Sequence, residues 1–268
     1  MKFYTYLDMV RKKRPLVHHI TNYVTVNDCA NIVLAAGASP VMADDPEEAA
    51  DMTGISQALV LNIGTLNSRT VTSMLAAGKK ANDLGIPVVF DPVGCGATVF
   101  RTDIARRIAS EVRLSVVRGN ISEIRSLCGL ESHTQGVDAS AADERENKVE
   151  TAQRAASAIG CVAAVTGKED VVTDGARTIL IENGCAAMAK ITGTGCMCTS
   201  LTGAFCGACP EALLEAAAAA VAYMGVCGEI ALRISGDNAL GHFHQALFDA
   251  AGAVDGNRLE EMAVYHEI

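Results

Sequence analysis

A short glycine-rich stretch, Gly193-Thr194-Gly195-Cys196, precedes an apolar run that is compatible with a helix. The start of a helix leaves about four backbone N–H groups without partners and carries the positive end of the helix dipole. Glycines there let a phosphate approach these donors, so Gly193 and Gly195 predict an anion cradle. The same position lowers the pKa of a thiol, which makes Cys196 a candidate for chemistry. The alternative is a glycine-permitted turn with a small buried cysteine.

Further candidates for chemistry lie where short apolar runs end. Asp91 follows the apolar run 86–90, and Arg118 follows the run 115–117. The carboxyl ends of parallel strands share one edge of a sheet, where open α/β folds bind ligands. A carboxylate that can hold Mg²⁺, an arginine that can bind phosphate and an anion cradle together predict phosphoryl transfer. The chain has no Gly-x-x-x-x-Gly-Lys-Ser/Thr motif, so it is not a P-loop enzyme.

Other polar candidates also allow a structural interpretation. Asn120 and Glu123 lie three residues apart at a predicted helix start, where they could face a ligand, but their spacing matches a capping box, which we favour on spacing alone. Asn22 could cap the helix that follows it or face a ligand. Met42 could line a pocket or fill the core, and Thr166 ends an apolar run.

The elements that would position these residues alternate along the chain. Short runs rich in Val and Ile predict strands over 15–20, 38–43, 58–63, 86–90, 115–118 and 161–165, each before a helical pattern. Asp174-Gly175 between two apolar runs predicts a hairpin, and the polar segment 131–149 predicts a surface loop and a helix start. The pattern predicts an α/β fold with a largely parallel central sheet flanked by helices, in a single domain over 1–268.

Composition excludes several function classes. The net charge of −9 and the pI near 5.2 argue against a nucleic-acid partner. No apolar run approaches the roughly 18 residues of a membrane span, so no membrane partner is expected. The first ten residues contain Asp8 and precede a basic run, the reverse of a secretion signal, which predicts a cytoplasmic location.

Ten cysteines are scattered through apolar segments, and we interpret them as reduced thiols that act as small hydrophobes. Cys206 and Cys209 have the spacing of a metal or redox pair. However, Cys196 and Cys198 point to different faces of a helix, so a closed zinc site is not favoured. His18 and His19 lie in an apolar strand, where one of the pair must point inward, so a core histidine is favoured over a metal ligand.

Six motifs are spread over essentially the whole chain: Ile20-Thr-Asn-Tyr-Val24 with Asn27, Gly37-Ala-Ser-Pro-Val-Met-Ala43, Asp91-Pro-Val-Gly94, Arg118-Gly-Asn-Ile-Ser-Glu123, Val165-Thr-Gly167 and Gly193-Thr-Gly-Cys196. In these motifs the chain resembles the hydroxyethylthiazole kinases of thiamine salvage, a family within the ribokinase-like fold.

This resemblance implies ATP-dependent phosphorylation of the primary alcohol of 4-methyl-5-(2-hydroxyethyl)thiazole with Mg²⁺. It implies site residues in four roles: Met42, Gly193 and Asn22 for the thiazole; Arg118, Thr166, Asn120 and Gly195 for ATP; Asp91 and Glu123 for the metal; and Cys196 as the base. The wider fold has Asp at the position of Cys196, and Cys there favours a thiazole kinase. The resemblance also implies a homotrimer with active sites at subunit interfaces, so segment 22–27 is expected to serve a neighbour's site.

Several alternatives stay open at this point. Other ribokinase-like enzymes are a hydroxymethylpyrimidine-type alcohol kinase and an ATP-dependent hydrate dehydratase. A non-catalytic nucleotide-binding regulator and a thiol enzyme with Cys196 as nucleophile are the alternatives of another class. No histidine is evidently paired with Cys196, which disfavours the thiol enzyme.

Overall fold

One central sheet organises the chain. The computed structural model describes residues 2–130 and 141–268, with the side chains of 141–144 left out. Within them the sheet has the strand order β2-β1-β3-β4-β5-β6-β7-β8-β9. The strands are β1 (Leu16–Ile20), β2 (Ser39–Met42), β3 (Ala58–Asn62), β4 (Val88–Asp91), β5 (Val116–Asn120), β6 (Val162–Thr166), β7 (Asp170–Thr173), β8 (Thr178–Ile181) and β9 (Tyr265–Glu267). From β2 to β6 neighbouring strands are parallel, and from β6 to β9 they are antiparallel.

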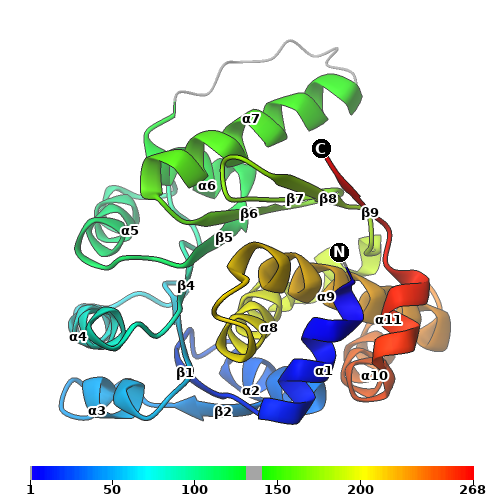
Figure 1. Cartoon of the computed structure of the whole chain (residues 1–268), viewed down its shortest axis with the longest axis horizontal. Coiled ribbons are helices and arrows are strands. Elements are labelled where there is room, and N and C mark those ends of the chain that lie inside the picture. Colours follow the sequence, from blue (N-terminus) through cyan, green and yellow to red (C-terminus); the bar gives the residue numbers. More distant parts are fainter. Residues whose placement is uncertain (1, 131–140) are drawn as a thin grey trace.

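Helices cover both faces of the sheet (Figure 1). One layer holds α3 (Ala49–Gly54), α4 (Ser68–Leu84), α5 (Val99–Glu111), α6 (Ile121–Cys128) and α7 (Ala141–Ile159). The other holds α1 (Phe3–Lys13), α2 (Val26–Ala36), α8 (Thr194–Ala208), α9 (Leu213–Ser235), α10 (Leu240–Ala253) and α11 (Gly256–Met262), with the 3₁₀ helix η1 (Ala186–Lys190) before α8. Because both faces are covered, the central strands are continuous apolar runs: every residue of β3 and β4 is buried.

The second layer packs closely on the sheet through α8. A Cβ added at Gly203 would lie 2.5 Å from Val60 Cγ2 and 3.2 Å from Val17 Cγ1, so this glycine lets the helix approach β1 and β3. The N-terminus of α8 therefore lies at the carboxyl edge of the parallel strands, where the candidate residues gather.

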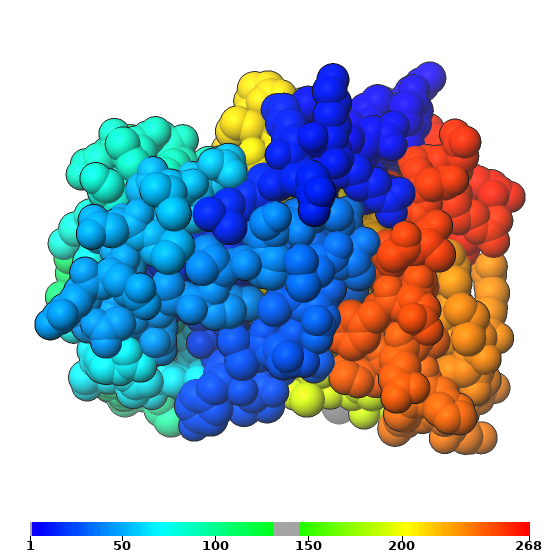
Figure 2. All heavy atoms as spheres, turned by 90° about the horizontal axis from the view of Figure 1, so that it is seen from below, coloured from blue at the N-terminus to red at the C-terminus, as the bar shows by residue number. Residues whose placement is uncertain are grey.

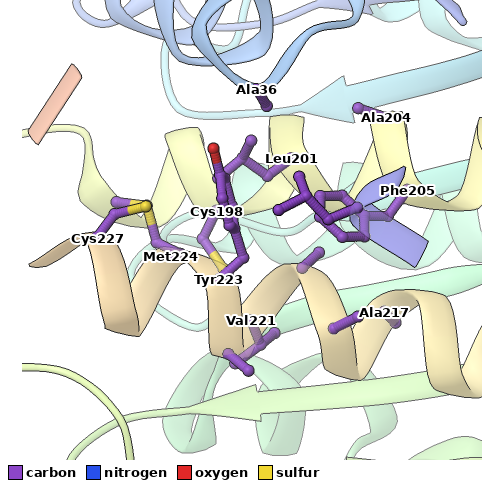
Figure 3. Packing of buried hydrophobic residues seen from close by; sticks show 14 of the residues in the cluster. Ala36, Cys198, Leu201, Ala204, Phe205, Ala217, Val221, Tyr223, Met224 and Cys227 are labelled. Carbon is purple, nitrogen blue, oxygen red and sulfur yellow. The ribbon is translucent and has the colours of Figure 1, made fainter. Parts of the chain in front are cut away.

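Helix α9 forms the centre of this layer. Figure 3 shows Tyr223 on α9 lying beside Leu201 and Phe205 on α8, whereas Val221 lies on the opposite side of α9; the rings of Phe205 and Tyr223 have centroids 5.7 Å apart. Within the described residues, α9 is the helix long and apolar enough to span a membrane, but 78% of its most apolar window is buried. Its apolarity is accounted for by its place in the core.

The structure confirms the predicted α/β fold, its largely parallel sheet and the hairpin of β7 and β8. His18 and His19 are both buried, although strand alternation predicted only that one of them points inward, because helices cover both faces of the sheet. The His18 ring nitrogens contact Thr53 Oγ1 and the Ala43 carbonyl. β9, α11 and η1 were not predicted from the sequence. The predicted surface loop lies outside the described residues as far as position 140. In Figure 2, which is seen from below, α2 (blue) lies beside α10 (orange).

Candidate active site

Three polar side chains end neighbouring strands and are hydrogen-bonded in a row. Asn22 follows β1, Asn62 ends β3 and Asp91 ends β4. Asn22 Nδ2 donates to Asn62 Oδ1 over 3.2 Å, and Asn62 Nδ2 donates to Asp91 Oδ2 over 3.0 Å. Asn22 Nδ2 also lies 3.1 Å from Cys196 Sγ at the start of α8. A continuous polar chain therefore connects the thiol to the buried carboxylate.

Asp91 is the most deeply buried of the ionisable side chains predicted for this site, with a relative exposure of 1%. Its Oδ2 accepts from Thr199 Oγ1 over 2.7 Å and lies 3.8 Å from Arg118 Nη1. Its Oδ1 is buried and has no hydrogen-bond partner among the described residues. Burial raises the pKa of Asp91 to about 6, although Arg118 and the hydrogen bond from Thr199 act in the opposite direction.

Cys196 lies in the first turn of α8 and is partly buried. The expectation that the helix start lowers its pKa is wrong in this structure: burial, and after it the nearby Asp91 carboxylate, raise the pKa of the Cys196 thiol. Hydrogen bonds from Thr25, Asn62 and Asn22 lower it but do not compensate. The helix-terminus effect applies to an exposed thiol, whereas this one is shielded from water beside a negative charge.

Glycines are required at both positions of the predicted cradle. Gly193 has a φ of 91° and caps α8, and a Cβ there would lie 2.7 Å from Thr25 Cγ2. A Cβ at Gly195 would lie 2.6 Å from Arg118 Nη1. The N-terminus of α8 thus lies beside the Arg118 guanidinium, and a phosphate bound at this helix start would also contact Arg118.

Arg118 and Thr166 are brought together from the adjacent strands β5 and β6. Arg118 Nη2 donates to Thr166 Oγ1 over 2.5 Å, while Arg118 Nε is buried without a partner among the described residues. Asp170 at the start of β7 accepts from the Gly167 N–H over 2.8 Å, and burial raises its pKa to about 6. The arginine therefore lies in a negative environment and keeps a free N–H donor.

Asn120 and Glu123 form the capping box that their spacing predicts. Asn120 Oδ1 accepts from the Glu123 N–H, and Glu123 Oε2 accepts from the Asn120 N–H, both over 2.9 Å. The structural interpretation is therefore confirmed for this pair. Glu123 has a second contact, because its Oε1 accepts from the Gly94 N–H over 2.8 Å. This bond ties α6 to the loop that follows Asp91.

The residues present fit Mg²⁺ better than zinc. No group of three or more His, Cys, Asp or Glu side chains that could hold a metal occurs in the part of the chain that the structure describes. Asp91 offers an unpartnered carboxylate oxygen, and the charge of Glu123 is close enough to raise the pKa of Asp91. One or two carboxylates completed by water and substrate phosphates are the usual protein ligands of Mg²⁺. All ten cysteines are free, and Cys206 and Cys209 are buried.

Met42 lies at the same edge but outside the hydrogen-bonded row. It is the last residue of β2 and pairs with His19 on β1.

Asn62 and Thr199 contact Asp91 yet were not among the predicted site residues. Asn62 could have been found, because it follows an apolar strand as Asp91 does. Thr199 lies inside an apolar helix and gave no signal. Asn22 contacts Cys196 of its own chain. The expectation that segment 22–27 serves a neighbour's site stays a prediction.

Comparison with known proteins decides the family. The sequence model described as the hydroxyethylthiazole kinase family matches residues 7–256. The chain belongs to the hydroxyethylthiazole kinase family. It is 52% identical to the hydroxyethylthiazole kinase of Clostridium beijerinckii over 100% of this chain and 98% of that one. It is also 52% identical to that of Ruminiclostridium cellulolyticum, over 97% and 95% of the two chains.

Solved structures agree with this assignment. The hydroxyethylthiazole kinase protein of Pyrococcus horikoshii superposes with a TM-score of 0.91 at 39% identity, covering 99% of this chain and 98% of that one. A ribokinase-like superfamily protein of Enterococcus faecalis has a TM-score of 0.64 at 13% identity, over 91% and 93% of the two chains, which supports the fold alone. The predictions of a ribokinase-like fold and of a hydroxyethylthiazole kinase are confirmed.

Proposed function

We propose that this hydroxyethylthiazole kinase transfers the γ-phosphoryl group of ATP to the primary alcohol of 4-methyl-5-(2-hydroxyethyl)thiazole at the carboxyl edge of the sheet. The observation that carries the proposal is the polar chain from Cys196 through Asn22 and Asn62 to Asp91. It connects Cys196, the candidate base, to Asp91, the candidate metal ligand, beside the N-terminus of α8. Phosphoryl transfer needs little more than such positioning and charge neutralisation.

Asp91 and Glu123 are the residues that would hold Mg²⁺, Asp91 through its unpartnered Oδ1. The ion, when bound, supplies positive charge to the phosphate oxygens. Arg118 and the backbone N–H groups at Gly195 then bind the remaining phosphate charge, with Thr166 holding the guanidinium in place. We assign Asn120 to the same nucleotide side, where it caps α6.

The thiolate of Cys196 accepts the alcohol proton as the new P–O bond forms. Its raised pKa keeps the thiolate fraction small but makes the thiolate a stronger base. The amide N–H of Asn22 points at Sγ and stabilises the anion that must form. We propose Met42, Gly193 and Asn22 as contacts of the thiazole ring.

We further propose a single domain over 1–268 that acts in the cytoplasm as a homotrimer with active sites at subunit interfaces. One continuous sheet through the described residues supports the single domain. Tyr23 and Val24, directly after Asn22, are 75% and 60% exposed. Large apolar side chains beside a site, open to solvent in one chain, are suited to contact a second subunit.

ADP release in the presence of ATP and Mg²⁺, with and without the thiazole alcohol, tests the proposal. We expect ADP release that depends on the thiazole, accompanied by its phosphate ester, and little with hydroxymethylpyrimidine or a nicotinamide hydrate. The variant Cys196→Ala is the matched control for chemistry at this site. Turnover with pyrimidine or hydrate but not with thiazole would refute the substrate assignment.

A further inference from the structure

Arg101, in the first turn of α5, has contacts that none of the assigned roles uses. Its Nη1 donates to the carbonyl oxygens of Ile63 over 2.7 Å and Val93 over 2.9 Å, and its Nη2 donates to the carbonyl of Gly64 over 2.8 Å. Ile63 and Gly64 directly follow Asn62, and Val93 belongs to the loop that follows Asp91. One guanidinium therefore connects the two loops that carry the hydrogen-bonded pair of the site.

We propose that Arg101 is a positioning residue for phosphoryl transfer, which clamps the loop after β3 to the loop after β4 and so fixes Asn62, Asp91 and the Gly94 N–H in their working arrangement. The inference rests on the proposed function and deepens it. The Arg101 guanidinium donates to backbone carbonyls, so it acts on the site through the loops.

The chemistry of the clamp favours arginine. Three carbonyl oxygens surround one guanidinium and accept hydrogen bonds from two of its nitrogens, Nη1 and Nη2, which a planar, permanently charged fork can satisfy together. The lysine ammonium is a point charge on a flexible stem, so it cannot reproduce the three directions. Hydrogen bonds from a charged donor are also the stronger class.

The local backbone is shaped around this side chain. Gly94 has a φ of 72°, and a Cβ there would lie 3.3 Å from Arg101 Cδ. The glycine thus provides both the left-handed turn and the room for the arginine stem. At its other end Arg101 is fixed by the start of α5, where its N–H donates to Thr98 Oγ1 over 3.2 Å. The clamp is therefore anchored on a helix.

Two backbone amides report directly on the clamped loops. The Gly64 N–H donates to Asn62 Oδ1 over 2.9 Å, and the Gly94 N–H donates to Glu123 Oε1 over 2.8 Å. If the guanidinium is lost, both loops gain freedom, the Asn62–Asp91 contact weakens, and Glu123 loses a fixed donor. The consequence is a poorer arrangement of both proposed metal carboxylates.

The test compares Arg101→Met and Arg101→Lys with the parent full-length protein, and uses Arg107→Met as control. Arg107 lies on the same helix, is exposed, and pairs with Glu111 four residues on. Amide hydrogen exchange without ligands, kcat, and the Mg²⁺ concentration for half-maximal rate are measured. For Arg101→Met we expect exchange at Gly64 and Gly94 to accelerate about tenfold or more, and kcat and Mg²⁺ response to worsen about 10- to 100-fold. Arg101→Lys should fall between, and Arg107→Met should match the parent.

If Arg101→Met shows faster amide exchange but the kcat and Mg²⁺ response of the parent, the proposal is overturned. Arg101 would then stabilise the two loops without a part in the reaction. Lost turnover with parental exchange at Gly64 and Gly94 would overturn the clamp itself. If Arg101→Met does not fold, Arg101→Lys is held to the same criteria. A parent that releases no ADP would refute the proposed function, while the exchange measurement still tests the clamp.

Discussion

The acidity of two buried groups, Cys196 and Asp91, defines the chemistry available at this site. Burial raises the pKa of both, and the Asp91 carboxylate further raises the pKa of Cys196. The thiol is therefore mostly neutral until positive charge enters the site. An exposed cysteine at a helix start would instead ionise before any positive charge binds.

The first prediction concerns Cys196. Cys196→Ala should lower kcat by about 100-fold or more, the usual scale for losing a general base, with the KM for thiazole nearly unchanged. Cys196→Asp supplies an ionised oxygen base and should keep or exceed the parental rate. Steady-state kinetics with excess ATP provides the measurement.

The control for this prediction is Cys198→Ala. Cys198 is buried (Figure 3) and lies near Arg118, but it is on another face of α8 than Cys196, so its loss should lower stability and reduce the rate far less than the loss of Cys196. Parental turnover in Cys196→Ala, or an inactive but folded Cys196→Asp, would exclude Cys196 as the base.

The second prediction concerns pH. Asp91 must be ionised to hold Mg²⁺, and its pKa is raised to about 6, so kcat/KM at limiting Mg²⁺ should fall as pH falls through about 6. The effect of pH on stability has the opposite sign. The pKa of Asp91 is about 6 in the folded chain and 3.8 ordinarily, so the free energy of unfolding decreases as pH rises from 3.8 to about 6.

Asp170 has a pKa near the same value and must be separated from Asp91. Asp170→Asn should retain the acid limb of the rate profile if Asp91 causes it. An acid limb that disappears in Asp170→Asn would assign the titration to Asp170 instead.

At the scale of elements, the start of α6 combines a helix cap with a proposed metal carboxylate. Glu123→Gln keeps the size of the side chain but removes its charge and turns an amide N–H toward one of its two backbone donors. We expect a loss of about 1 kcal/mol in the free energy of unfolding and a steep fall in turnover. Denaturant unfolding and Mg²⁺ titration measure the two effects. An unchanged Mg²⁺ dependence in both Glu123→Gln and Asp91→Asn would refute the metal assignment.

The close packing of α8 on the sheet gives a second prediction at this scale. Gly203→Ala places a methyl group 2.5 Å from Val60 Cγ2 and should destabilise the fold by about 1–3 kcal/mol. Gly252→Ala is the matched control, because its Cβ would meet no atom within 4 Å, and it should be neutral or stabilising. Thermal unfolding compares them, and equal effects at both positions would contradict the role given to Gly203.

Local signals explain which elements the sequence could predict. Asn67 and Gly85 bound α4, and the asparagine caps its start as such residues do. In contrast, β9 has only three residues and exists because it pairs with β8, far back in the chain. The residues of the candidate site also fall into those that local sequence signals predict and those that they do not. Asp91 and Arg118 stood out at strand ends, whereas the Thr199 contact and the raised pKa of Cys196 depend on tertiary packing.

At the scale of the whole molecule, the polar row belongs to one chain while exposed apolar residues lie beside it. We predict a particle of three subunits of 27.9 kDa each by analytical ultracentrifugation. After subunit exchange, Tyr23→Ala mixed with Cys196→Ala should regain part of the activity, since Tyr23 is exposed and can reach a neighbour.

Asn22→Ala mixed with Cys196→Ala should regain none, because both residues serve the same chain's site. Recovery in the Asn22 mixture, or failure of both mixtures in confirmed hybrids, would contradict this division between own-chain and neighbour residues.

The two ends of the chain lie against each other, and this has a consequence for synthesis. The Phe3 and Tyr265 rings have centroids 4.2 Å apart, and α1 packs on α9 and α11. Ribosomes extend chains at about 5–20 residues per second, and N-terminal segments generally fold first. Here the layer that begins with α1 stays open until α8 to α11 have emerged. During that interval the residues of β1 and β3 that α8 covers, such as Val17 and Val60, have no partner, so we expect the nascent chain to be prone to aggregation until its C-terminal helices pack.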